Sequence, residues 1–69
     1  MTVEIVVNGA VQRLDPSPAT VAELVRALNL EGKRIAVERN GEIVPKGRYG
    51  DTPIVSSDKL EIVAAVGGG

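Results

Sequence analysis

The chain has 69 residues, with 8 Lys and Arg against 9 Asp and Glu, and contains neither Cys nor His. The near-neutral balance argues against a nucleic-acid partner, because binding to phosphates depends on a dense basic patch. Without Cys or His the chain lacks a thiol nucleophile, the commonest metal ligands and the side chain best suited to proton transfer near neutral pH. We therefore expect no metal site, no bound cofactor and no enzyme activity of its own.

The N-terminus and the apolar runs predict a cytoplasmic protein without a membrane partner. Met1 to Glu4 contain no basic region followed by a long apolar stretch, and no apolar run approaches the ~20 residues that span a bilayer. A chain of this length buries only a small core, so one domain is expected.

The first 14 residues predict a β-hairpin. Val3, Ile5 and Val7 alternate with their neighbours in the period-two pattern of a strand with one buried face. Asn8-Gly9 follows, and both residue types tolerate the positive φ that a type I′ hairpin turn requires. Val11 to Leu14 then form the expected returning strand.

A helix is predicted after the proline-containing break at Asp15 to Pro18. Thr20 and Glu23 form a capping box, in which the Thr20 hydroxyl accepts from the Glu23 amide and the Glu23 carboxylate reaches back to the Thr20 amide. Apolar residues recur at i, i+3, i+4 and i+7 and give the helix one buried stripe: Val21, Leu24, Val25 and Leu28. Gly32 is expected to end the helix in the left-handed conformation.

The second half of the chain predicts three further strands. Residues 35–38 alternate, Asn40-Gly41 is a second tight turn, and residues 42–44 form the next strand. Lys46 to Pro53 is a polar loop with a short helical turn. Leu60 to Val66 is apolar on both faces apart from one Glu, which favours a central strand. The order of elements predicts an α+β fold, a mixed sheet of about five strands with one main helix packed across one face.

Two groups of side chains are candidates for a site. Four carboxylates have no recognisable catalytic spacing and are interpreted as solvated surface charge: Glu42, Asp51, Asp58 and Glu61. Lys46, Arg48 and Tyr49 form a basic and aromatic cluster for a phosphate or a partner protein. The interpretation favoured for Tyr49 is a ring that covers one end of the core.

The glycines Gly67, Gly68 and Gly69 follow the last strand directly. A run of glycines does not pack or fix its backbone, so we divide the chain into a domain at residues 1–66 and a flexible tail at residues 67–69. Composition alone favours a disordered tail without a function of its own. In a protein without Cys or His, however, a covalent carrier role would have to use the Gly69 carboxylate.

Four blocks together resemble the ThiS family of thiamine-pathway sulfur carriers: Thr20 to Leu24, Ala36 to Pro45, Leu60 to Val63 and Val66 to Gly69. The resemblance covers nearly the whole chain, and Val37 to Pro45 is its most specific part. It implies a ubiquitin-like β-grasp fold with the first and last strands parallel at the centre of the sheet.

The resemblance also implies a carrier chemistry. An adenylating enzyme of the E1-like ThiF type would use ATP to adenylate Gly69, and sulfur from a persulfide donor would then replace AMP to leave a C-terminal thiocarboxylate. That sulfur would pass to a ThiG-type thiazole synthase. Gly67 and Gly68 would thread the active site of the partner, because a tail without Cβ atoms enters a narrow channel.

A docking patch is expected on the sheet face opposite the helix. If the first and last strands are parallel, the outward-facing residues Val6, Val63 and Ala65 lie near one another at the root of the tail and form an apolar patch for the adenylating enzyme. The chain departs from the family at Ala64-Ala65, where a His or Gln beside a bulky apolar residue is common.

Other functions stay open at this point. The same fold with a Gly-Gly end serves in the small subunit of molybdopterin synthase, a sulfur carrier of another pathway. A ubiquitin-like modifier or a plain interaction module belongs to a different class.

Overall fold

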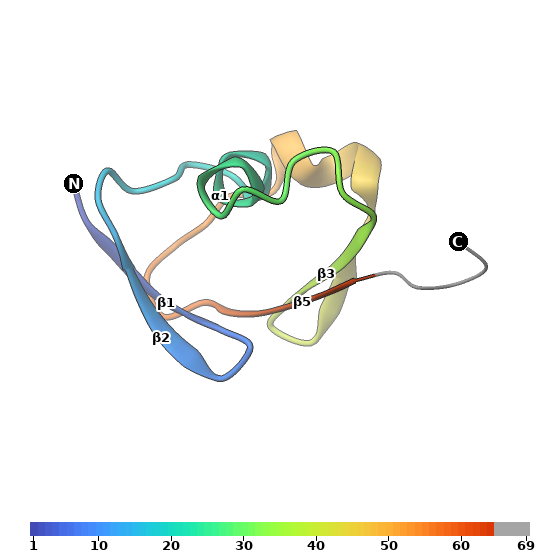
Figure 1. Cartoon of the computed structure of the whole chain (residues 1–69). Coiled ribbons are helices and arrows are strands. Elements are labelled where there is room, and N and C mark those ends of the chain that lie inside the picture. The colour runs from blue at the N-terminus through green and yellow to red at the C-terminus, as the bar shows by residue number, and fades with distance from the viewer. Residues whose placement is uncertain (65–69) are drawn as a thin grey trace.

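One five-stranded mixed sheet, ordered β2-β1-β5-β3-β4, carries the fold (Figure 1). The structure is a computed structural model that describes residues 1–64. Its strands are Val3–Val7 (β1), Ala10–Leu14 (β2), Ile35–Arg39 (β3), Glu42–Val44 (β4) and Lys59–Ala64 (β5). The predicted α+β class and the central position of the last strand are confirmed.

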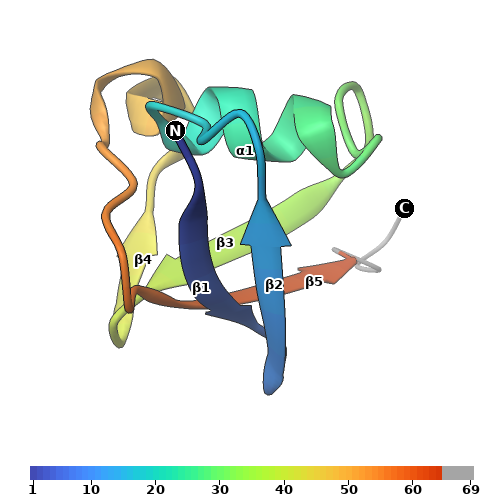
Figure 2. The same cartoon turned by 90° about the vertical axis from the view of Figure 1, so that its left-hand side faces the viewer.

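Both hairpin turns and the parallel pair are confirmed. Asn8 and Asn40 have φ values of 52° and are each followed by a glycine at positive φ, as a type I′ turn requires. β1 runs parallel to β5, whereas β2, β3 and β4 pair antiparallel with their neighbours. In the strand order the two hairpins thus lie on either side of β5. Figure 2 shows β5 running across the direction of β1 and β2.

The helix α1 (Val21–Ala27) lies across one face of the sheet (Figure 2). Its cap differs in one contact from the expected box. The Thr20 hydroxyl accepts from the Glu23 amide at 3.3 Å, but the Glu23 carboxylate accepts from the Ala19 amide at 3.0 Å rather than from Thr20. The carboxylate therefore caps the residue before the N-cap, at the point where Ala19 is also bonded to Ile54.

The helix ends earlier than predicted. Asn29, not Gly32, is the left-handed residue that closes it, with a φ of 61°. The Asn29 amide donates to the Arg26 carbonyl at 3.0 Å and the Leu30 amide donates to the Val25 carbonyl at 2.9 Å. These two bonds form a Schellman motif, in which asparagine replaces the commoner glycine.

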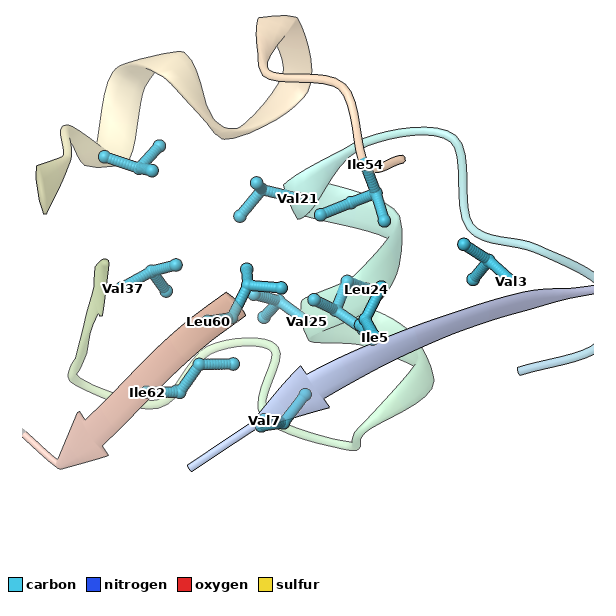
Figure 3. Packing of buried hydrophobic residues seen from close by; sticks show 11 residues of the cluster. Val3, Ile5, Val7, Val21, Leu24, Val25, Val37, Ile54, Leu60 and Ile62 are labelled. Carbon is cyan, nitrogen blue, oxygen red and sulfur yellow. The ribbon is translucent and has the colours of Figure 1, made fainter. Parts of the chain in front are cut away.

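The core lies between α1 and the sheet, where branched aliphatic side chains interdigitate (Figure 3). The inward-facing residues of β1, α1 and β5 supply most of it, and Ile54 closes one end. Eleven residues form this cluster: Val3, Ile5, Val7, Val21, Leu24, Val25, Val37, Val44, Ile54, Leu60 and Ile62. The predicted stripe on the helix is thus buried, with Leu28 packed at its edge.

A 3₁₀ helix, η1 (Lys46–Asp51), packs beside α1 at the point where the loop was predicted to make a helical turn. Neither α1 nor η1, the two helices in the described part of the chain, is long and apolar enough to cross a membrane.

Replacement of Leu24 by Ala tests the core. Leu24 is fully buried, so Leu24→Ala should lower the free energy of unfolding by about 2–5 kcal/mol through lost burial and the cavity left behind. Urea denaturation followed by circular dichroism measures the change. Val11→Ala is the control, because Val11 is 65% exposed and its loss should stay within about 0.5 kcal/mol. Equal losses in the two variants would contradict the assigned packing.

Candidate functional site

The last residues of β5 are the described residues that lie nearest in sequence to the glycines predicted to react. Gly67, Gly68 and Gly69, as well as Ala65, lie outside the described residues. The structure describes β5, the strand that precedes these residues in sequence. β5 pairs with β3 as far as Ala64, whose register partner is Ile35.

The register corrects the expected docking patch. Val6 and Val63 both face away from α1, as predicted, and Val63 is 57% exposed. However, Val6 lies opposite Lys59 in the parallel pair, four residues before Val63 on β5. Val6 and Val63 therefore share a face without being neighbours. The reason is that β1 meets β5 only at the beginning of β5.

Val63 has a different apolar neighbour. It pairs with Ala36 across β3, and both side chains lie on the open face of the sheet. Glu61 separates this pair from Lys59 and Val6 along β5. Among residues 1–64, Val63 and Ala36 thus form the apolar part of the open face beside the last part of β5.

A buried carboxylate lies directly before β5. The interpretation of Asp58 as a solvated surface charge is wrong, because the residue is only 3% exposed. Its Oδ2 accepts from Arg39 Nε at 2.9 Å and from the Val55 amide at 2.9 Å. Its Oδ1 accepts from Arg39 Nη2 at 3.3 Å and from Asn40 Nδ2 at 3.0 Å.

These contacts satisfy the Asp58 carboxylate with four donors. Burial raises the pKa of Asp58, but the bonds from Val55, Arg39 and Asn40 and the charge of Arg39 outweigh it, so the pKa lies below its usual value. Arg39 and Asn40 belong to the block that carries the strongest family resemblance. That block therefore has a structural task, which is to hold the start of β5 against the second hairpin.

The other candidate residues from the sequence lie at or near the protein surface. Glu42, Asp51 and Glu61 are exposed, which confirms their interpretation as solvated charges. Tyr49 is partly buried against the core cluster, as predicted, and burial raises the pKa of its hydroxyl. Lys46 and Arg48 are exposed near this ring. Within residues 1–64, no group of three or more Asp or Glu side chains is placed to hold a metal ion.

Two asparagines that are predicted only as turn residues, Asn8 and Asn40, also contact β5. The Asn8 side chain exchanges two hydrogen bonds with the backbone of Ile62, and the Asn40 side chain accepts from the Lys59 amide at 2.9 Å. No local pattern indicates these contacts, because the partners lie 54 and 19 residues away.

Known proteins resemble the chain in sequence and in fold. The model of the ThiS family matches residues 3–69. A sulfur carrier protein ThiS of Bacillus subtilis is 39% identical over 62 residues, which cover 90% of this chain and 94% of that protein. A thiazole synthase of Paramagnetospirillum magneticum is 44% identical over 66 residues, or 96% of this chain, but the chain spans only 20% of that protein's length.

The fold comparison agrees with the sequence comparisons. A crystal structure of the thiamine biosynthesis protein ThiS from Geobacter metallireducens superimposes with a TM-score of 0.83 and 29% identity. The superposition covers 96% of this chain and 99% of that one. The ubiquitin-like β-grasp fold implied by the resemblance is thereby confirmed.

The pH dependence of stability tests the role of Asp58. A carboxylate whose pKa is lowered by folding stabilises the protein above its unfolded pKa, and this stabilisation disappears as the pH falls through the folded pKa. Asp58→Asn should lower the free energy of unfolding by about 2–3 kcal/mol at neutral pH. The difference from the wild type should shrink once the pH falls below about 4.

Urea denaturation at a series of pH values measures this difference. Asp51→Asn serves as the matched control, because Asp51 is exposed and its replacement should change little at any pH. A cost of Asp58→Asn that is the same at neutral and acid pH would contradict the assigned ion pair.

Proposed function

The chain belongs to the ThiS family, and from this membership we propose that it is the sulfur carrier for thiazole formation in thiamine biosynthesis. The observation that carries the proposal is the match to the Bacillus subtilis sulfur carrier over 94% of that protein's length. Because the matched family region, residues 3–69, includes the three glycines, the proposal extends to the chemistry of Gly69. The thiamine pathway is favoured over molybdopterin synthesis on the same ground.

The reactive group is the α-carboxylate of Gly69. A carboxylate is a poor acyl donor, so an adenylating enzyme of the ThiF type first joins it to the α-phosphate of ATP and releases pyrophosphate. The terminal sulfur of a persulfide donor then attacks the carbonyl carbon, and AMP leaves. A thiol then exchanges with the remaining S–S bond, which leaves a thiocarboxylate on Gly69 and the donor sulfur in a disulfide with that thiol.

The chain contributes an acyl group on a stem, and its partners contribute the catalysis. Gly67 and Gly68 have no side chains, so catalytic groups of a partner can close around the carbonyl carbon of Gly69. β5 is the stem, paired with β3 up to Ala64. The position of β5 in the middle of the sheet supports separate roles for the two parts of the chain. The domain holds β5 in place, and the glycine tail takes part in the reaction.

Thiazole synthase is the proposed acceptor of the sulfur. A protein named thiazole synthase in Paramagnetospirillum magneticum contains a stretch that matches 96% of this chain. Such a match within a longer protein supports a functional association between this domain and the synthase. The adenylating enzyme and the persulfide donor are inferred from the chemistry that a thiocarboxylate requires.

Intact-mass analysis tests the carrier function. After incubation with ATP, the cognate adenylating enzyme and a persulfide donor, the chain should gain the mass difference between sulfur and oxygen. Fragmentation should place the change on Gly69. A Gly68→Val variant should remain folded but lose most of the modification, since its side chain obstructs the channel. Full modification of Gly68→Val, or none of the wild type, would contradict the proposal.

The docking surface yields a separate prediction. We expect Val63, beside Ala36 on the open face, to contact the adenylating enzyme, so Val63→Lys should weaken the complex about tenfold by burying a charge in an apolar contact. Isothermal titration calorimetry measures the affinity. Val55→Lys is the control, because Val55 is a similarly exposed valine in a loop outside the sheet. Unchanged binding of Val63→Lys would remove Val63 from the interface.

A further inference from the structure

The pairing of β5 with its two neighbours is unequal in length. β3 accompanies β5 from Leu60 to Ala64, whereas the parallel pair with β1 ends where Val7 meets Leu60. β1 then turns away into the first hairpin. The last part of β5 would therefore be held along one edge only, in the stretch that leads to the reactive end.

Asn8 supplies the missing contact. Its amide donates to the Leu60 carbonyl at 2.9 Å. Its side-chain Oδ1 accepts from the Ile62 amide at 2.8 Å, and its Nδ2 donates to the Ile62 carbonyl at 2.9 Å. A carboxamide carries one donor and one acceptor side by side, so it can replace a peptide group in a strand pair. The Asn8 side chain thus extends the β1 edge by one further rung.

The turn alone does not require this side chain. At a φ of 52°, glycine fits the first central position of a type I′ turn as well as asparagine does. Aspartate would keep an acceptor for the Ile62 amide but has no donor for the Ile62 carbonyl. Only asparagine both forms the turn and makes the two bonds to β5.

We propose that Asn8 is a positioning residue for the carrier reaction, because it fixes the last part of β5 and so the point from which the chain end is delivered to the adenylating enzyme. This inference rests on the proposed function. Ends of strands fray unless they are held by hydrogen bonds or packing. Without the Asn8 bonds, the enzyme must order the end of β5 itself, and this cost raises KM while leaving kcat unchanged.

Asn40 offers a matched control. It has the same φ of 52° and precedes Gly41 in the second hairpin turn. Its side chain also makes two hydrogen bonds, one from the Lys59 amide and one to Asp58. These contacts hold the start of β5, however, five residues before Ala64. Asn40→Gly therefore removes as many bonds as Asn8→Gly without touching the end of the strand.

The test measures ATP–pyrophosphate exchange catalysed by the cognate adenylating enzyme, with the full chain as the varied substrate. Thermal unfolding is followed in parallel, so that the kinetics are compared at a temperature at which all variants are folded. Asn8→Gly should raise KM for the carrier about tenfold, as expected for two lost hydrogen bonds, with kcat little changed. Asn8→Asp should give an intermediate KM, and Asn40→Gly should stay close to wild type.

The possible results separate the inference from the proposed function. An unchanged KM for Asn8→Gly, or an equal rise in Asn8→Gly and Asn40→Gly, would overturn the positioning role and leave the carrier function intact. If the wild-type chain itself supports no exchange, the proposed function fails instead. A fall in thermal stability common to both glycine variants, with a KM change in Asn8→Gly alone, supports the inference.

Discussion

The structure depends on the requirement that β5 be hydrogen-bonded along both edges. A strand in the middle of a sheet exposes backbone donors and acceptors on two sides, and each group left unpaired costs free energy. The first hairpin supplies one edge through β1 and the second supplies the other through β3. Since one partner of β5 lies near the N-terminus and the other in the middle of the sequence, neither hairpin completes the sheet alone. The helix then covers the face on which Leu60 and Ile62 are buried.

Polar side chains complete this arrangement where the strands themselves do not reach. Asp58 ties the start of β5 to Arg39 and Asn40, and Asn8 ties its later part to the first hairpin. A small domain has little core to spare, so bonds of this kind carry a larger share of the stability than in a larger protein. The same bonds bear on the proposed function, because β5, which precedes Gly67, Gly68 and Gly69 in sequence, is hydrogen-bonded to both hairpins. In the proposed carrier function, the domain holds β5 in place, and the last glycines and the partner enzymes carry out the chemistry.

Local signals in the sequence predicted much of this fold. The Asn-Gly pairs, the Thr20 cap and the alternation in the strands were sufficient for the elements, because turns, caps and periodicity depend on neighbouring residues. Contacts between distant residues were not accessible in this way. The burial of Asp58 depends on Arg39, which is 19 residues away, and the separation of Val6 from Val63 depends on a register that periodicity does not define. The helix end was misplaced because Asn29 competes with Gly32 for the left-handed position, and packing of Leu30 on the core accompanies the earlier end.

Hydrogen exchange at the backbone of β5 tests most directly the claim that this strand is a fixed base. The Ile62 amide is bonded to a side chain rather than to another strand, so it is the most sensitive point. We predict that the Ile62 amide exchanges only through global unfolding, with the same free energy of opening as the Leu60 amide within the parallel pair. Exchange of Ile62 through a local opening, much faster than that of Leu60, would contradict it.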